Sequence, residues 1–303
     1  MSLDWTSLIH ESLNLSIPLI LAALGGLVQL RAGIVNIAIE GQMICGALAG
    51  FVASATFKSF QIGILSSVIF GAIFGAFTSF LIIYLKGNEI LIGLGFNVLI
   101  VGAIGYVLKS VLNISGTVSS KNVVSIPKFN LLSESSPNFL LVIFNGHDIL
   151  YWISLILIAI IPFFLAKTRS GLRLRSVGLS PTISTSLGLK VNKIKMFAGV
   201  FAGAMAGVAG CELCLGQVGL FNLQMIAGRG FIALAAFYFG RLAPLPTSIA
   251  CLIFAFFDSL QVQLQLLSFS ANLVNTLPYA MVIVALAASQ IMLKMKMRGS
   301  MRI

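Results

Sequence analysis

The sequence predicts an all-α integral membrane protein, because its apolar residues form long runs and its charged residues are few. Of 303 residues, 58% are hydrophobic and only 9% are charged, and the mean hydropathy is +1.05. A soluble domain of this length needs far more charged surface to stay dissolved. Apolar runs of about 18 residues match the hydrocarbon core of a bilayer when they are helical. The clearest runs lie at 62–84, 90–108, 149–165, 196–215 and 273–293.

Taken in chain order, the apolar segments number about nine and are expected to form a single transmembrane domain over residues 1–303. They lie near residues 13–30, 33–56, 62–85, 89–111, 149–166, 196–215, 221–241, 246–267 and 272–293. The residues before the first segment lack the basic region of a cleavable signal peptide, so we expect this segment itself to direct membrane insertion.

Two of these segments are interrupted by polar residues at membrane depth. The first interruption lies at residues 31–41 and the second at residues 216–229. We expect broken or re-entrant helices at both places, since irregular backbone persists in a membrane where it lines a protein cavity. The polar residues concerned are Arg31, Asn36, Glu40, Gln217, Asn222, Gln224 and Arg229.

The two interruptions share a short sequence similarity. The first contains Gly33-Ile-Val-Asn36 and the second contains Gly219-Leu-Phe-Asn222. Transporter folds are often built from internal repeats, although a four-residue match also arises by chance. The sequence leaves both origins of the match open.

Positive charge sets the expected orientation of the chain. The loop at about residues 167–195 is rich in Lys and Arg and contains no Asp or Glu, and the tail after residue 293 is also basic. We therefore place both on the cytoplasmic side. Counting spans backward puts the loop at about 112–148, which is rich in Ser, Asn and Pro, on the external side together with the N-terminus.

A short helix is predicted within the basic loop, from Pro181 to Gly188. Ser180 is a suitable N-cap, Pro181 suits the first helical position, and Gly188 ends the helix. A short helix held between two spans on the cytoplasmic side suits docking by a soluble partner.

Small residues form a ridge in the segment that follows this loop. Gly199, Gly203 and Gly207 recur every four residues, with alanines beside them. Such a ridge allows a second helix to approach closely. It predicts helix packing and says little about a substrate.

Ionisable and amide side chains at membrane depth are the strongest candidates for function. Each charge at the bilayer centre costs roughly 2.5–3.5 kcal/mol on insertion scales, so these groups should face a cavity, the bundle interior or each other. Helical spacing places Asn36 and Glu40 on one face, and Asp258 and Gln261 on another. The candidates for a solute pathway are Asn36, Glu40, Asn222, Asp258 and Gln261. Contact between helices is the alternative: it is favoured for Glu40 and stays open for Asp258 and Gln261.

Catalytic and nucleotide-binding motifs are absent from the sequence. It has no G-x-x-x-x-G-K-[S/T] phosphate loop and no G-x-S-x-G elbow, and His10 and His147 are expected outside the apolar spans. Cys211 and Cys214 have C-x-x-C spacing, but in an apolar Gly/Ala-rich helix they fit small buried side chains better than a metal site. The excess cations flank the spans, which does not indicate nucleic-acid binding. We expect no catalytic residue, metal or cofactor in this chain.

Three stretches resemble the permeases of bacterial ABC importers, in the branched-chain-permease-like family that carries nucleosides and simple sugars. Arg31-Ala-Gly-Ile-Val-Asn-Ile-Ala-Ile-Glu40-Gly-Gln-Met43 is similar to the N-terminal signature of the family. Thr168-Arg-Ser-Gly-Leu-Arg-Leu-Arg175-Ser-Val-Gly178 is similar to its cytoplasmic coupling loop. Gly228-Arg-Gly-Phe-Ile-Ala-Leu-Ala-Ala236, with Phe239-Gly240-Arg241 after it, is similar to the nucleoside branch.

This resemblance implies a transport subunit rather than an enzyme. The chain would be the multi-pass permease subunit of an ATP-driven nucleoside importer in the bacterial cytoplasmic (inner) membrane. The implied partners are a cytoplasmic ABC ATPase that binds ATP and Mg, a second related permease chain in a heterodimer, and an extracytoplasmic substrate-binding protein or lipoprotein. The residues implied to form the ATPase-coupling loop are Arg173, Arg175, Gly178, Pro181 and Gly188.

Other interpretations of the sequence stay open beside this one. A simple-sugar importer of the same architecture has the same residue types, since both kinds of solute are polyols. An ion-driven secondary transporter would work without any ATPase. A scaffold that transports nothing is disfavoured by the charges at membrane depth.

Overall fold

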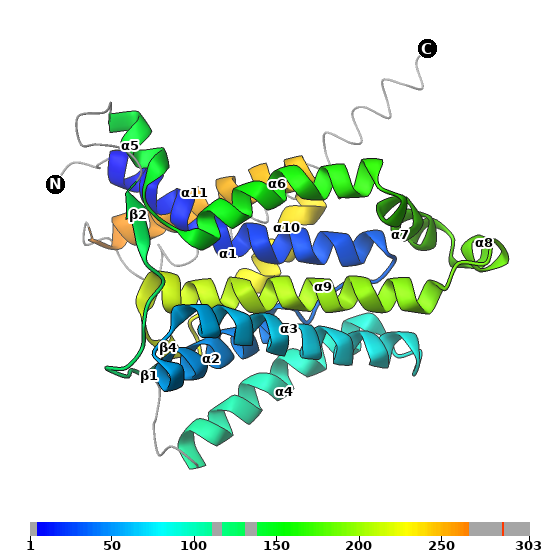
Figure 1. Ribbon diagram of the computed structural model, residues 1–303, viewed down its shortest axis with the longest axis horizontal. Helices are drawn as coiled ribbons and strands as arrows, with labels where there is room; N and C mark the ends of the chain where they lie inside the picture. The colour runs from blue at the N-terminus through cyan, green and yellow to red at the C-terminus, as the bar shows by residue number, and fades with distance from the viewer. Residues whose placement is uncertain (1–4, 111–116, 131–137, 267–286, 288–303) are drawn as a thin grey trace.

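The computed structural model describes residues 5–110, 117–130, 138–266 and 287 of the chain (Figure 1). Its helices are α1 Trp5–Arg31, α2 Ile39–Phe57, α3 Phe60–Ile83, α4 Glu89–Ser110, α5 Asn138–Phe144, α6 Ile149–Lys167, α7 Arg169–Leu179, α8 Pro181–Ser186, α9 Val191–Cys211, the π-helix η1 Glu212–Val218, α10 Arg229–Phe239 and α11 Pro244–Leu266. The described residues also form the short strands β1 Thr117–Val118, β2 Lys128–Asn130, β3 Asn145–Asp148 and β4 Phe221–Asn222. These strands make two antiparallel pairs, β1 with β4 and β2 with β3.

The predicted all-α membrane fold is confirmed. Seven helices in the described part of the chain are long and apolar enough to cross a membrane: α1, α2, α3, α4, α6, α9 continued by η1, and α11. The expected segment at 221–241 contains instead a strand, turns and the 11-residue helix α10. The expected segment at 272–293 lies outside the described residues, apart from residue 287. The total of about nine and the single-domain organisation therefore stay predictions.

The boundary predicted for the first segment is wrong. Helix α1 begins at Trp5 rather than near residue 13, and so includes His10. The start of α1 was not predicted because polar residues in its first turns interrupt the apolar run. Those residues are accommodated by neighbours: Ser12 donates to the carbonyl of Leu8, and His10 lies 3.1 Å from the carbonyl oxygen of Asn145.

The basic loop is more helical than predicted. The helix expected from Pro181 is confirmed as α8, and the Ser180 hydroxyl caps it by accepting from the amide of Ile183. A second helix, α7, precedes it and was not predicted. It begins after Thr168, whose hydroxyl accepts from the amide of Gly171 at 3.0 Å.

The core of the bundle lies around α1 and α9. In each of these helices the apolar window is about four-fifths buried, at 78% and 83%, whereas only 28% is buried in α3, α4 and α6. The less buried helices therefore present apolar faces toward lipid. Helix α9 packs closely on α3, because a methyl group at Gly203 would overlap the backbone of Gly71, and one at Gly207 the carbonyl of Ser67. At Gly199 it would overlap the side chain of Ser79.

The two ends of the bundle differ in charge and structure. Helices α7 and α8 lie at one end, and α5 with the β2–β3 hairpin lies at the other (Figure 1). Helix α1 runs from the hairpin end to the end that holds α7, where Arg31 completes its last turn. We call the end formed by Arg31, α7 and α8 the basic end.

Candidate functional site

The first break in the membrane helices separates α1 from α2 at residues 32–38. Gly33 makes the turn with a φ of +85°, a conformation that favours glycine. Asn36 is 3% exposed, and its Oδ1 accepts from the amide of Ala38 at 3.0 Å. Its Nδ2 donates to Oε1 of Gln42, also at 3.0 Å. Asn36 thus holds the break together and is closed off from a solute in this structure.

The second break separates η1 from α10 at residues 219–228. Gly219 has a φ of +72°, and Oδ1 of Asn222 accepts from the amide of Gln224 at 2.8 Å. Each break therefore contains a left-handed glycine, followed three residues later by an asparagine that bonds the amide two residues on. The short sequence similarity between the two breaks therefore corresponds to the same kind of turn. Asn222 lies at the strand pair β1–β4, where it donates to Oγ1 of Thr117 at 2.9 Å.

Glu40 connects the two breaks. It is the second residue of α2, and its two carboxylate oxygens accept from the amides of Gly228 and Gly230, both at 2.8 Å. Amides in the first turn of a helix lack partners within the helix, and the helix dipole favours a carboxylate there. Glu40 therefore caps α10, which agrees with the helix-contact interpretation favoured for this residue. The N-termini of α2 and α10 meet at this carboxylate, and we call the place the helix junction.

An ion pair lies beside the helix junction. Nη2 of Arg229, the first residue of α10, is 2.8 Å from Oδ2 of Asp258 on α11, and the two side chains are 19% and 15% exposed. Asp258 thus pairs with a neighbouring arginine while keeping some access to its surroundings. Gln261 lies on the same helix three residues further on, half-buried. Of the predicted pathway residues, the structure gathers Glu40 and Asp258 at the junction and leaves Asn222 apart from them, half-buried at the strand pair β1–β4.

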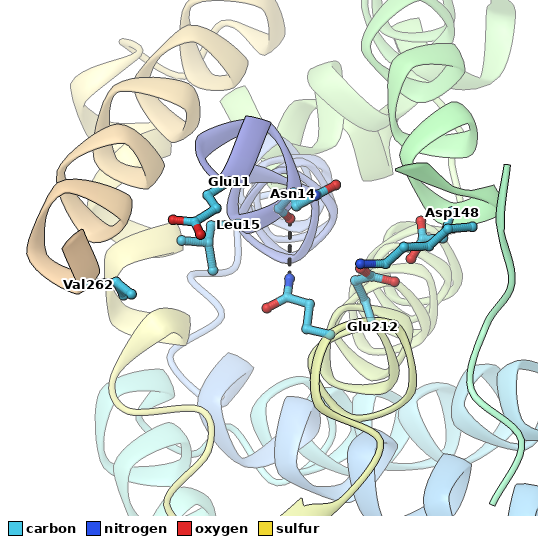
Figure 2. A pocket seen from close by; sticks show the side chains of 9 residues that line it. Glu11, Asn14, Leu15, Asp148, Glu212 and Val262 are labelled. Atoms are coloured by element: carbon cyan, nitrogen blue, oxygen red, sulfur yellow. Dashed lines mark hydrogen bonds between the residues drawn. The ribbon is translucent and has the colours of Figure 1, made fainter. Parts of the chain in front are cut away.

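A polar cavity of about 220 Å³ lies near the hairpin end, between α1, η1, the hairpin and α11 (Figure 2). Asp148 and Glu212 point into it from one side, and Glu11 borders the other side (Figure 2). Gln217 donates to the backbone carbonyl of Asn14 at 3.2 Å across this space. Glu212 is 1% exposed, and its Oε2 has no hydrogen-bond partner among the described residues. Within the same residues, no group of three or more His, Cys, Asp or Glu is placed to hold a metal ion.

Sequence reasoning did not find this cavity, which Glu212 helps to line. Its carboxylate meets Asp148, which the sequence shows only as the last residue of a long polar loop. A usable signal was present: an Asp directly before a long apolar run is a common N-cap. Oδ1 of Asp148 does cap α6, accepting from the amide of Tyr151 at 3.0 Å.

A pair of histidines ties the hairpin to α1. The rings of His10 and His147 are stacked with centroids 4.7 Å apart, and Nδ1 of His147 lies 2.6 Å from Oδ1 of Asn14. Burial is the main cause that lowers the pKa of His147, which lies outside the membrane-spanning helices. This side chain is therefore held neutral as part of the packing.

The predicted coupling residues lie at the basic end, on α7 and α8. Arg173 is exposed, whereas Arg175 is half-buried and lines a cavity with Arg31. Gly178 packs against the first break: a Cβ at Gly33 would lie 3.1 Å from the Cα of Gly178. Pro181 begins α8, and Gly188, with a φ of +79°, ends the turn that follows it.

Known proteins match the chain over most of its length. The nucleoside ABC transporter permease protein NupC of Lactococcus lactis is 32% identical over 84% of this chain and 82% of its own length. The guanosine ABC transporter permease protein NupQ of Bacillus subtilis is 31% identical over 92% of this chain and 90% of its own length. A Haloferax volcanii protein with the provisional name of a glucose ABC transporter permease is 29% identical over 88% and 80%. No solved structure matches the chain.

A comparison with protein families agrees with the family resemblance found in the sequence motifs. The family described as the permease component of branched-chain amino acid transport systems matches residues 8–286. The match includes both breaks, the helix junction and the basic loop, so the predicted recognition is confirmed. The chain belongs to this family of permease components.

Proposed function

We propose that this ABC transporter permease forms the membrane pathway of an ATP-driven importer of nucleosides in a bacterial cytoplasmic membrane. The names of the Lactococcus and Bacillus relatives support nucleosides as the solute, since both align with most of the chain. The family match supports a transport subunit rather than an enzyme.

The surface of α8 is the observation that carries the coupling part of the proposal. Ile183 and Leu187 are 63% and 74% exposed at the basic end, and Arg173 is exposed on the preceding helix. Large apolar side chains on a water-facing segment favour a protein partner. A cytoplasmic ABC ATPase fits this position, and it would bind ATP and Mg itself. Helix α8 would then pass the closing of the ATPase on to the membrane helices.

The helix junction is the proposed place where this chain contributes to the pathway. Asp258 and Gln261 keep partial exposure on α11, and Phe231 and Tyr238 are exposed on the neighbouring helix α10. A second, related permease chain would cover this face and enclose the pathway between two subunits. A substrate-binding protein or lipoprotein would deliver the solute at the hairpin end.

A simple sugar is the second candidate solute. The Haloferax relative, whose provisional name refers to glucose, favours it. Nucleosides and sugars share hydroxyl groups, which carboxylates and amides bind equally well. A competition experiment separates the two.

The first experiment measures uptake of labelled inosine in cells that express this chain with its ATPase, binding protein and partner permease. The control strain carries a replacement of the phosphate-loop lysine in the ATPase. We expect uptake to disappear in the control and to be blocked by unlabelled nucleosides but not by glucose or ribose. Uptake that survives in the control would show an ion-driven transporter, and competition by sugars alone would overturn the nucleoside assignment.

A charge reversal tests the coupling surface. Arg173→Glu should uncouple ATP hydrolysis from uptake without preventing membrane insertion, because the Arg173 side chain is exposed. Ile183→Asp should have the same effect from α8. Normal uptake by both variants would remove the docking assignment while leaving the solute assignment intact.

A further inference from the structure

A cavity of about 430 Å³ at the basic end brings two arginines together. Arg31 from the end of α1 and Arg175 from α7 both line it. No Asp or Glu lines this cavity in the part of the chain that the structure describes. The two guanidinium groups are close enough to repel each other. Two like charges held together in a partly buried site need an anion to balance them.

The hydrogen bonds of the two arginines leave a donor unused. Arg31 donates its Nε and Nη2 to the backbone carbonyl of Leu242, at 2.9 and 2.5 Å. Nε of Arg175 is buried and has no hydrogen-bond partner among the described residues. A buried N–H without an acceptor costs free energy, so such a group usually marks a partner that has yet to be placed.

The backbone fixes the two arginines in this arrangement. Gly178, one turn after Arg175, packs directly against the last turn of α1, because a methyl group there would overlap the carbonyl of Arg31. The Arg31 side chain is in turn fixed to the turn between α10 and α11 through Leu242. The backbones of α1 and α7 are therefore held together beside the cavity, and the Arg31 side chain is fixed within it.

Four leucines, with Ser176 and Gly178, make the rest of the lining. Leu30 and Leu242 are half-buried, while Leu172 and Leu179 are exposed. Arg31 is also the last residue of a helix that is long and apolar enough to cross a membrane, so we expect the cavity to lie near the membrane surface. Two guanidinium groups next to exposed apolar side chains at this level match a phosphate group attached to acyl chains.

We propose that this cavity binds the phosphate group of an anionic phospholipid from the cytoplasmic leaflet. Arginine suits this ligand because its planar donors match phosphate oxygens, and basic pockets beside membrane helices commonly hold lipid headgroups. The Nε of Arg175 donates to a phosphate oxygen, and the acyl chains lie against Leu172 and Leu179. The site overlaps the predicted coupling loop at Arg175 and Gly178, but the exposed coupling residues Arg173 and Ile183 do not line the cavity.

The test measures thermal unfolding of the purified transporter, with its partner subunits, in neutral detergent. Phosphatidylglycerol, phosphatidylcholine or inorganic phosphate is added in separate titrations. We compare the unaltered complex with Arg175→Gln, Arg175→Lys and the matched control Arg169→Gln, which removes the same charge from an exposed position on the same helix. Phosphatidylglycerol retained through purification is measured in parallel by mass spectrometry.

We expect phosphatidylglycerol to raise the unfolding temperature of the unaltered complex and of Arg169→Gln. Arg175→Gln should lose most of this shift and retain about fivefold less of the lipid, as expected for one basic residue at a membrane surface. Without anionic lipid, Arg175→Gln should be as stable as the unaltered complex or more so, because a repulsion is removed. Arg175→Lys should fall between the two.

Three outcomes would overturn the proposal. An equal shift with phosphatidylcholine, whose phosphate is balanced by its own choline cation, would show that the site does not select an anionic lipid. A full shift with inorganic phosphate would assign the site to a free anion. Equal loss of lipid in Arg169→Gln and Arg175→Gln would show a diffuse effect of positive charge rather than this cavity.

Discussion

The two breaks in the membrane helices use the same turn but differ in what supports them. At the first break, Asn36 is buried and hydrogen-bonds Ala38 and Gln42, both close to it in the chain. Gly178 of α7 packs against Gly33 of this break. At the second break, Asn222 is half-buried on a two-residue strand pair, and its hydrogen bonds are exposed. The second break also relies on Glu40, a residue supplied by α2 just after the first break. Contacts close to the first break thus hold it in its conformation, whereas the second break depends on a carboxylate supplied from beside the first.

Removing the connection between the breaks should have the largest effect. Glu40→Ala leaves the amides of Gly228 and Gly230 without acceptors, at a cost of about 2–4 kcal/mol in the free energy of unfolding. Glu40→Gln keeps the size and one acceptor, so its effect should be about half as large. Thermal unfolding in lipid nanodiscs, followed by uptake, measures both. If the two variants unfold like the unaltered protein, α10 is held by other contacts.

Placing a methyl group on each of the two glycines compares the breaks directly. Gly33→Ala and Gly219→Ala both force alanine to a positive φ, at about 1–2 kcal/mol each. Gly33→Ala should cost about 1 kcal/mol more, because its Cβ meets the backbone of Gly178 at 3.1 Å. Among the described residues, the Cβ at Gly219 meets only the Ser125 hydroxyl, at 3.2 Å. The difference between the two unfolding temperatures is the measurement, and equal losses would mean that α7 yields easily.

The asparagine of the second break should show the smallest effect, and the two asparagines should differ most clearly in the free energy of unfolding that each replacement costs. Asn36→Ala leaves the buried amide of Ala38 without a partner, at about 2 kcal/mol. Asn222→Ala should cost about 0.5 kcal/mol, because water can replace its bonds at the surface. Asn222→Asp serves as a control that keeps the acceptor for the amide of Gln224, whereas Asn36→Asp would place a buried carboxylate against Oε1 of Gln42. A larger loss at Asn222 than at Asn36 would contradict the comparison.

Much of this fold follows from residue patterns that act locally. Long apolar runs identified the membrane helices, and Ser180 with Pro181 identified α8, because length and capping are properties of neighbouring residues. The places of both breaks were also predicted, since clustered polar residues at membrane depth are rare in an unbroken helix that faces lipid. The start of α1 and the presence of α7 were missed because their polar residues are satisfied by contacts that the local sequence does not show.

The site was harder to predict because it depends on partners far apart in the chain. Nothing near Glu40 indicates that it caps a helix 188 residues later. Asp148 and Glu212 lie together on one side of the polar cavity, although one ends strand β3 and the other begins η1. Arg173 and Arg175 were expected to act alike, yet the turn of α7 exposes one and directs the other toward Arg31. Helix phase relative to neighbours decides such differences, and this phase depends on packing.

The contact between Gly33 and Gly178 has a mechanical consequence. Where side chains separate two helices, rotamer changes can absorb a small displacement of one helix before the backbone of the other moves. Here the backbones touch with no side chain between them. A displacement of α7 at the basic end would therefore move the backbone of the first break by a similar amount. From there Glu40 would carry it to α10, so the chain has a short, stiff linkage from its water-facing end to the middle of the bundle.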